Sequence, residues 1–292
     1  MIYRAFHKTV YRYSEPVSMC HNHVYLTPPS DSRQNLLRTR LDIDPEPEQT
    51  TPGRDYFGNH VVFFTVQEQH TSLTIAATSV VDVKPMDVPP EGPTPAWEEV
   101  RDHVASYPDD EALDAFQYCF DSPFVRTGVQ FASYALPSFP VGRGLVEAVA
   151  DLNRRIHEEF RYEPMATTIA TPVVQVLRER HGVCQDFANV MIGCLRSLRL
   201  PARYVSGYLR SGPRMVGAEA SHAWVQVWCP GAGWIDFDPT NNVMPSGAHL
   251  TVARGRDYGD VTPVKGVAFG GGAHTVEVSV VVTPEFAEPD NE

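Results

Sequence analysis

The sequence lacks the features typical of membrane, secreted and nucleic-acid-binding proteins. No stretch approaches the roughly 18 consecutive apolar residues of a membrane-spanning helix, and the N-terminal stretch MIYRAFHKTVYRYSEP has no apolar signal-peptide core. Lys and Arg number 24 against 36 Asp and Glu, so the formal net charge is −12, whereas binding to a phosphate backbone needs a concentrated basic surface. The sequence therefore predicts a cytoplasmic protein that binds neither nucleic acid nor membrane.

Cysteine is also scarce, and its pattern excludes two further classes of protein. The chain has five cysteines, an odd number, and no CxxC motif, which argues against a disulfide framework and a cysteine-rich zinc site. The segment CHNH brings Cys20, His21 and His23 together, but no second ligand pair is spaced to complete a tetrahedral metal site. We therefore expect no metal and no cofactor, and we expect most of the cysteines to be reduced and buried.

The pattern of apolar residues divides the chain into three regions. Residues 1–84 alternate apolar and polar positions in short segments separated by turn residues, which is typical of an antiparallel β-sandwich. Residues 85–140 begin with a proline-rich stretch and continue with two helical patterns, which predicts a linker and a helical connection. Residues 141–292 are expected to form a second domain that includes a C-terminal strand.

The second domain reads as helices followed by strands. The stretch 145–160 has apolar residues at helical spacing, and a second apolar stripe begins directly after Cys184 and includes Cys194. The segments ARYVSGYL, HAWVQVW, WIDFDP and HTVEVSVVV then alternate as strands do. The predicted fold class is therefore α+β, with a β-sandwich followed by helices packed on an antiparallel sheet.

Cys184 lies between a glycine-containing turn and the first turn of the predicted helix. A thiolate is stabilised by a helix N-terminus and by a nearby imidazolium, so this position suits a nucleophile. His222, at the start of a strand pattern in SHAWVQVW, is the best-placed histidine. An isolated cysteine is more often a buried packing residue. A nucleophilic role for Cys184 therefore requires a histidine and an acidic residue close to it.

The strands on either side of CPGAG predict a hairpin that supplies a third residue. If Trp228 pairs with Ala232, then His222 lies opposite Asp238 on the same face, and Asp236 lies opposite Trp224. A slip of one residue would put Phe237 opposite His222 instead. The contact between His222 and Asp238 is therefore a prediction that depends on this register.

Together, GVCQDFANVMIGCLRSLRLPARYVSGY, SHAWVQVW and GWIDFDPTN resemble the core of the bacterial transglutaminase-like superfamily. The first 84 or so residues, notably DYFGNHVVFF, also resemble the β-rich N-terminal domain of many bacterial members. The resemblance implies a papain-like core with a catalytic triad in which Cys184 is the nucleophile, His222 the base and Asp238 the residue that orients the histidine.

The resemblance also implies a reaction. Cys184 would attack an amide or peptide carbonyl and form a thioester acyl-enzyme, with the Cys184 backbone N–H and the Tyr162 hydroxyl as oxyanion donors. We expect a cysteine-dependent amide hydrolase or acyltransferase, a protease or amidase, whose substrate is a peptide, a protein or a small amide. Two alternatives stay open: a true transglutaminase that transfers acyl groups to amines, and a non-catalytic scaffold that binds peptides.

Overall fold

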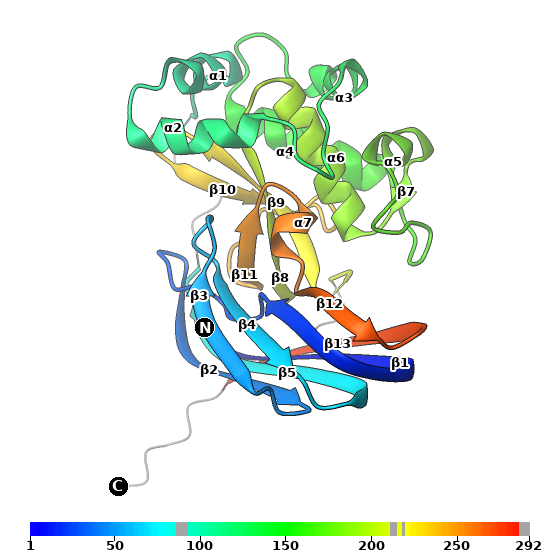
Figure 1. Cartoon of the computed structure of the whole chain (residues 1–292). Helices are drawn as coiled ribbons and strands as arrows, with labels where there is room; N and C mark the ends of the chain where they lie inside the picture. The colour runs from blue at the N-terminus through cyan, green and yellow to red at the C-terminus, as the bar shows by residue number, and fades with distance from the viewer. Residues whose placement is uncertain (86–92, 211–214, 218–219, 286–292) are drawn as a thin grey trace, which may run out of the picture.

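The computed structural model describes residues 1–85, 93–210, 215–217 and 220–285. The described residues form three layers: a β-rich region that contains the first and the last strands, a smaller sheet above it, and a layer of helices on the far side of that sheet (Figure 1). No helix in these ranges is long and apolar enough to cross a membrane.

The β-rich region is a seven-stranded antiparallel sheet built around one long strand, β1 (Ile2–Val24). The sequence pattern predicted two strands within this stretch, whereas the structure has one. The first half of β1 pairs with β5 (His70–Val83) and β13 (His274–Pro284), and the second half pairs with β4 (His60–Val66) and β12 (Val264–Gly270). The outer strands are β2 (Gln34–Asp44) and β3 (Gln49–Arg54).

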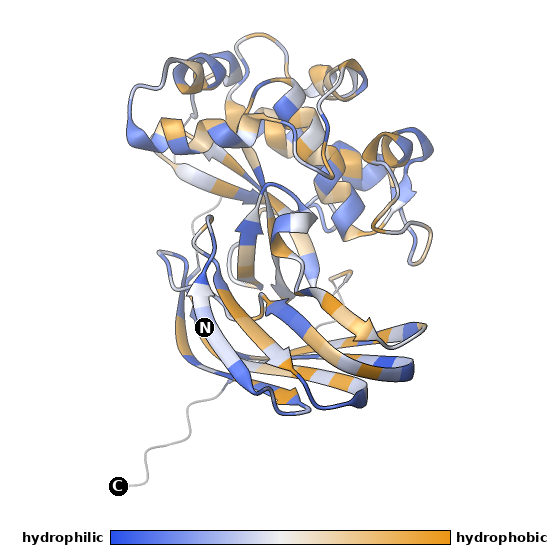
Figure 2. Ribbon diagram, viewed as in Figure 1, coloured by the Kyte–Doolittle hydropathy of each residue, from blue (hydrophilic) through white to orange (hydrophobic). Residues whose placement is uncertain are grey.

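Apolar residues from both halves of this sheet share one core. Val17, Phe64, Leu73, Ile75 and Val264 are among the residues buried there. Figure 2 shows hydrophobic and hydrophilic residues alternating along the strands, because successive side chains point to opposite faces. The antiparallel β-rich N-terminal region predicted from the sequence is confirmed.

The C-terminal strands belong to this sheet and not to the region that carries the helices. The sequence pattern placed the strand at the C-terminus with residues 141–292, but β12 and β13 both pair with β1. Alternation identifies a strand without identifying its partner, so this pairing was not predictable from periodicity.

The second region places helices on one face of a four-stranded antiparallel sheet, as predicted. The sheet order is β10-β9-β8-β11. Its strands are β8 (Ala202–Leu209), β9 (His222–Cys229), β10 (Gly233–Phe237) and β11 (His249–Gly255). The helices are α1 (Trp97–Ser106), α2 (Asp110–Phe116), α3 (Val129–Ala135), α4 (Leu145–Glu159), α5 (Val173–Glu179), α6 (Cys184–Ser197) and α7 (Tyr258–Val261), with 3₁₀ turns at Gln117–Cys119 and Leu136–Ser138.

Helix α6 is the central element of this region. It packs against β8 and β9 and is covered on its other sides by α3, α4 and α5. Every residue from Asp186 to Arg196 is therefore buried. A helix this deeply buried is held by tertiary packing more than by its own propensity, so its first residue has a fixed position in the molecule.

The two regions are joined by polar contacts along β11. The Gln34 side chain donates to the Thr251 carbonyl at 2.8 Å and accepts from the Thr251 amide at 2.9 Å. Nearby, the Arg254 guanidinium pairs with Asp31, and the Asn59 side chain accepts from the Arg254 amide at 2.8 Å. The β-rich region therefore supports the sheet that carries the candidate site.

Candidate active site

Cys184 is the first residue of α6, and its side chain is partly buried. The Asp186 carboxylate accepts a hydrogen bond from the Val183 amide at 2.8 Å and another from the Thr167 hydroxyl at 2.6 Å, which fixes the start of the helix. A Cβ at Gly182 would lie 2.5 Å from Asp186 Oδ2, so only glycine allows this approach. The amide of Cys184 is one of the first-turn donors that have no partner within a helix.

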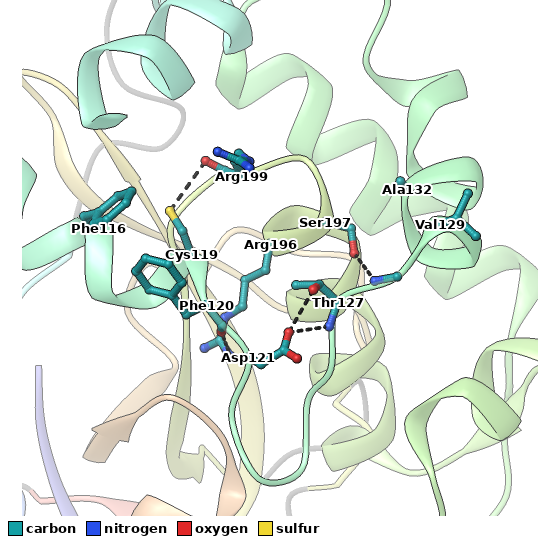
Figure 3. Close-up of a pocket in the computed structure, with 11 residues that line it drawn as sticks. Phe116, Cys119, Phe120, Asp121, Thr127, Val129, Ala132, Arg196, Ser197 and Arg199 are labelled. Carbon is teal, nitrogen blue, oxygen red and sulfur yellow. Dashed lines mark hydrogen bonds between the residues drawn. The ribbon is translucent and has the colours of Figure 1, made fainter. Parts of the chain in front are cut away.

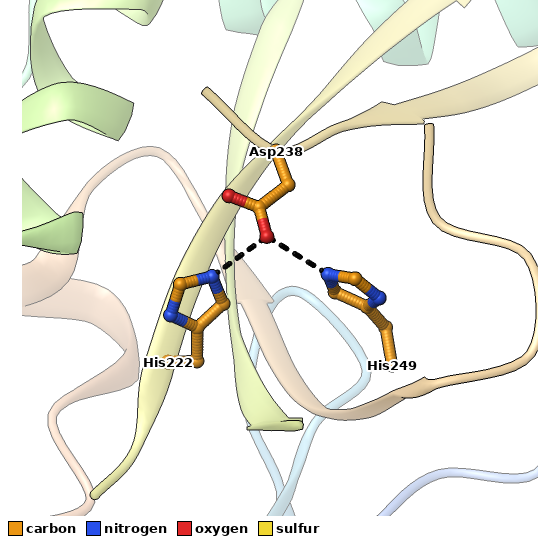
Figure 4. Close-up of side chains that lie close together, drawn as sticks. All are labelled: His222, Asp238 and His249. Carbon is orange, nitrogen blue, oxygen red and sulfur yellow. Dashed lines mark hydrogen bonds and ion pairs between the residues drawn. The ribbon is translucent and has the colours of Figure 1, made fainter. Parts of the chain in front are cut away.

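His222 and Asp238 are in direct contact, as the hairpin argument predicted. His222 is the first residue of β9, and its Nε2 lies 2.9 Å from Asp238 Oδ2, with both side chains fully buried. Figure 4 shows the two side chains pointing toward each other from β9 and from the end of β10.

The register behind that prediction is wrong by two residues. Trp228 pairs with Trp234, not Ala232, because Pro230, Gly231 and Ala232 all lie in the turn. A shift of two keeps every side chain on its predicted face. Asp238 follows the last paired residue of β10 and reaches His222 diagonally, while Asp236 accepts a hydrogen bond from Trp224 Nε1 at 2.7 Å.

His222 and Asp238 each stabilise the charged form of the other. Burial alone would lower the pKa of His222, but the Asp238 carboxylate and the hydrogen bond to it outweigh burial, Cys184 adds to their effect, and the pKa of His222 rises to about 10. Burial would raise the pKa of Asp238, yet His222 and His249 hold it well below its usual value. An imidazolium and a carboxylate are therefore the stable forms at neutral pH.

The second ring nitrogen of His222 faces the rest of the site. Nδ1 is buried and has no hydrogen-bond partner among the described residues, and Cys184 is close enough to contribute to the raised pKa of the ring. A Cβ at Gly217 would lie 2.9 Å from Nδ1 and 3.8 Å from Tyr162 Oη. The imidazole thus uses Nε2 for Asp238 and leaves Nδ1 available for proton exchange with a thiol.

Tyr162, the predicted side-chain donor for the oxyanion, lies at this site. Its short strand, β6 (Arg161–Tyr162), pairs in parallel with β7 (His181–Gly182), just before Cys184. Burial, followed by the nearby Cys184, raises the pKa of Tyr162 to about 12, so the phenol keeps its proton. Its hydroxyl can therefore donate a hydrogen bond, although its role as an oxyanion donor stays a prediction.

Two residues of the site were missed by the sequence reasoning. His249 Nε2 lies 2.9 Å from Asp238 Oδ2, and Asn241 Nδ2 donates to the same oxygen at 2.9 Å. The Asn241 side chain also accepts from the Val216 amide at 2.8 Å. Asn241 could have been found from its position three residues after Asp238, but His249 is separated from the motifs and had no signal of its own.

His222, Asp238 and His249 are also the group of described residues whose atoms could hold a metal ion. The two nitrogens both lie 2.9 Å from one oxygen, which is the geometry of two N–H donors on a shared acceptor. The three side chains are at most 4% exposed, so no open coordination position faces solvent. We interpret the group as a hydrogen-bonded network.

The predicted packing cysteines are all unpaired and buried: Cys20, Cys119, Cys194 and Cys229. Burial raises the pKa of Cys119 to about 12 and that of Cys229 to about 11, and it also raises those of Cys20 and Cys194. Cys184 is thus the only cysteine that is both partly exposed and next to an imidazole among the described residues.

A pocket of about 610 Å³ lies away from Cys184, beside α3 and the end of α6 (Figure 3). The Cys119 thiol in its wall donates to the Arg199 carbonyl at 3.5 Å. The buried Arg196 guanidinium there donates to backbone carbonyls of Phe120, Ala202 and Arg256. These groups are already satisfied, so the pocket has no evident chemistry.

A helix-borne thiol, a strand-borne imidazole and a carboxylate behind it define a papain-like class of cysteine-centred protein. The chain belongs to the transglutaminase-like superfamily, as the sequence resemblance indicated. Residues 141–239 match the family described as "Transglutaminase-like superfamily", and residues 3–82 match the family described as "Bacterial transglutaminase-like N-terminal region".

Two similar proteins match nearly the whole chain, and a third matches about a third of it. An uncharacterized protein of Mycobacterium tuberculosis is 42% identical over 298 residues, which span 97% of this chain and 92% of the relative. A crystal structure of a candidate cysteine protease from Cytophaga hutchinsonii matches with a TM-score of 0.76 at 20% identity, over 98% of this chain and 92% of the other, which shows the shared fold. A protein-glutamine gamma-glutamyltransferase of Pseudomonas aeruginosa is 30% identical over 128 residues, 36% of this chain and 19% of the relative.

Proposed function

We propose that this protein is a cysteine-dependent hydrolase of amide bonds that acts through a thioester at Cys184. The observation that carries the proposal is the buried His222–Asp238 pair, which leaves His222 Nδ1 free beside a thiol at a helix N-terminus. Papain-type catalysis needs these three groups in this order.

Before the first half-reaction, the thiol proton of Cys184 already lies on His222 Nδ1, since the imidazolium is the stable form of His222 at neutral pH. The thiolate Sγ then attacks the carbonyl carbon of the substrate. The carbon–sulfur bond forms as the carbonyl oxygen becomes an oxyanion. The Cys184 amide and the Tyr162 hydroxyl are the proposed donors to that oxyanion. Return of the Nδ1 proton to the leaving nitrogen breaks the carbon–nitrogen bond and leaves the acyl group on sulfur.

In the second half-reaction, water attacks the thioester while His222 Nδ1 takes one of its protons. The new carbon–oxygen bond forms, and the carbon–sulfur bond breaks to regenerate the thiolate beside the imidazolium. Throughout both steps Asp238 accepts from Nε2–H, which holds the tautomer that exposes Nδ1. The substrate class we propose is a peptide, a protein or a small amide.

Transfer to an amine is the second candidate, because the Pseudomonas relative carries that activity in its name. Hydrolysis is preferred since water is far more concentrated than any amine in the cytoplasm, which stays the predicted location. Partition of a preformed acyl-enzyme with and without an added primary amine separates the two. A dominant amide product would favour the transferase.

The nucleophile is tested by alkylation with iodoacetamide near pH 6.5, followed by peptide mapping. Cys184 is expected to react at least tenfold faster than the other four thiols, because they are buried and have raised pKa values. The Cys184→Ala variant should lose the fast phase, and Cys229→Ala, the matched control, should keep it. Fast alkylation that persists in Cys184→Ala and maps to another cysteine would overturn the proposal.

A further inference from the structure

Asp238 serves two histidines, and the mechanism above uses only one of them. His249, the first residue of β11, places Nε2 at 2.9 Å from Asp238 Oδ2, the same distance and the same oxygen as His222 (Figure 4). The two rings come from different strands and are both buried. A carboxylate oxygen that accepts from two imidazoles has its charge shared between them.

We propose that His249 is a positioning residue for the reaction at Cys184: its Nε2–H holds the Asp238 carboxylate in place and takes up part of the charge that Asp238 would otherwise direct at His222. The proposal rests on the function proposed above. It assigns His249 to the Asp238 carboxylate and not to the substrate.

Asp238 needs such a partner because its backbone lies outside the paired part of β10. The last paired residue is Phe237, and the Asp238 backbone is held by an isolated bridge to Val243. Its Oδ1 accepts from the amides of Thr240 and Asn241 at 2.9 and 3.2 Å. The Oδ2 atom, which meets the catalytic imidazole, depends on side-chain donors for its position.

His249 is suited to donate without adding charge. Burial lowers the pKa of His249, and the nearby charge of His222 lowers it further, although Asp238 acts in the opposite direction. The ring is therefore neutral at neutral pH, and its single N–H must be on Nε2 to reach Asp238. Its Nδ1 is buried without a hydrogen-bond partner among the described residues, which agrees with an unprotonated nitrogen.

The other charged groups near His249 come from both regions of the molecule. His222 and Asp238 face it directly, and Trp224 packs edge-on against it with ring centres 5.1 Å apart. Behind it, Arg33, Lys84 and Asp236 help to line a cavity of about 20 Å³ that His249 also borders. Arg33 and Asp236 form an ion pair, so they partly cancel each other at the His249 ring.

This arrangement explains how one imidazole can both take and return a proton. Without His249, Asn241 would be the one described side chain that shares Oδ2 with His222, and the carboxylate would hold the imidazolium too firmly for rapid return of its proton to the leaving nitrogen. With His249 in place, its Nε2–H also donates to Asp238 Oδ2, so less of the carboxylate charge acts on His222. Loss of His249 should therefore raise the pH at which His222 loses its proton and slow turnover.

The test compares His249→Leu, which removes the donor, with His249→Gln, whose side-chain amide can donate to the same oxygen. The readouts are the pH profile of Cys184 alkylation by iodoacetamide and the kcat and KM for a p-nitroanilide, an amide whose leaving nitrogen must take up the proton from His222. In His249→Leu we expect the upper inflection to rise by about half a unit or more and kcat to fall on the order of tenfold at similar KM. His249→Gln should restore both toward wild type.

The matched control is His7→Leu, since His7 is a buried histidine that bonds Thr9 and Tyr208 and does not touch Asp238. It should lower thermal stability and leave the inflection unchanged. A His249→Leu profile that superimposes on that of wild type, with rapid alkylation intact, would overturn the role of His249 alone. Slow alkylation of Cys184 in the wild-type protein would instead overturn the proposed function.

A measurement on the wild-type chain keeps the inference testable if His249→Leu does not fold. The ¹⁵N shifts of the histidine rings at pH 7 should show His249 as the neutral Nε2–H tautomer and His222 as the imidazolium. A neutral Nδ1–H form of His249 would contradict the inference. So would stoichiometric zinc bound at the two histidines in the purified protein.

Discussion

The Asp238 carboxylate accepts hydrogen bonds from two backbone amides and from the side chains of His222, His249 and Asn241. Donors therefore hold both oxygens of the carboxylate, Oδ1 by backbone amides and Oδ2 by side chains, and the carboxylate charge raises the pKa of His222. Cys184, by contrast, owes its place to the start of α6, where Gly182 and Asp186 shape the turn. Cys184 and the carboxylate that bonds His222 are therefore held by separate parts of the structure.

Replacing Asp238 with Asn should slow alkylation of Cys184 near pH 6.5 by on the order of 10²-fold, because the imidazolium that stabilises the thiolate loses its counter-charge. The measurement is the rate of iodoacetamide labelling. Asp236→Asn is the control: it lies on the same face but bonds Trp224 and Arg33, so it should reduce stability and retain fast labelling. Equal rates for Asp238→Asn and wild type would contradict the role of Asp238.

The buried histidines should give stability a pH dependence of two opposite signs. The pKa of His222 is raised from 6.5 to about 10, so its contribution is complete below about pH 6.5 and is lost as the pH rises toward 10. Burial lowers the pKa of His7 to about 4, so its contribution is complete above about pH 6.5 and is lost as the pH falls toward 4.

Urea unfolding from pH 4 to 10 measures both effects. Asp238→Asn should flatten the loss of stability above pH 7, and His7→Leu should flatten the loss below pH 6. An alkaline slope that is unchanged in Asp238→Asn would show that His222 does not carry the raised pKa.

Among single residues, the sequence predicted Cys184, His222 and Asp238, but it did not predict the residues that hold Asp238 in place. Cys184, His222 and Asp238 stand in recognisable local motifs. His249 and Asn241 act through one carboxylate, and that convergence depends on where β11 and the turn after Asp238 lie in space. A single sequence has no local pattern that predicts contacts of His249 and Asn241 with the same carboxylate.

Among the elements, β8 and β9 bring His222 close to the backbone of a neighbouring strand. Gly207 pairs with His222 across the two strands. A Cβ at Gly207 would lie 2.2 Å from the Leu250 carbonyl oxygen and 2.4 Å from the Trp224 ring. Glycine is therefore required for β11 and Trp224 to approach β8 together.

Gly207→Ala should destabilise the protein by about 2 kcal/mol or more, because backbone on one side and a fully buried ring on the other leave the methyl group no space. Thermal or urea unfolding measures the loss. Gly247→Ala is the control, since a Cβ there has no neighbour within 4 Å, and its stability should match wild type. Equal stability of the two variants would contradict the described packing.

Most elements were predictable, but their pairing was less so. The spacing of apolar residues located α4, α6 and the strands that carry His222 and Asp238. The hairpin register was wrong by two because periodicity of two fixes the face and not the exact partner. The contact between His222 and Asp238 survived the error for the same reason: both registers keep the two residues on one face.

For the whole molecule, the β-rich region and the region that carries the helices are interdependent. The chain begins in β1 and returns at its end to add β12 and β13 on the same strand. Arg33, from the β-rich region, pairs with Asp236, which also accepts a hydrogen bond from Trp224 Nε1, and the Trp224 ring stacks with His222. The proline-rich stretch predicted as the boundary lies partly outside the described residues, at 86–92, and the strands β12 and β13 that follow it pair with β1 before it.

Deleting residues 1–84 should leave a chain that does not fold cooperatively, because β12 and β13 lose their partner strand and expose apolar residues. Solubility, circular dichroism and the sharpness of thermal unfolding measure this. A soluble, cooperatively folded fragment with fast alkylation of Cys184 would show that the two regions are independent.

The central claim is that Cys184 forms an acyl-enzyme with the help of His222, and p-nitrophenyl acetate tests it most directly. After brief reaction and acid quenching, mass spectrometry should find one acetyl group per chain on the peptide that contains Cys184. The group should be absent from Cys184→Ala and strongly reduced in His222→Ala. Acetylation at another residue, or equal acetylation of Cys184→Ala, would contradict the account.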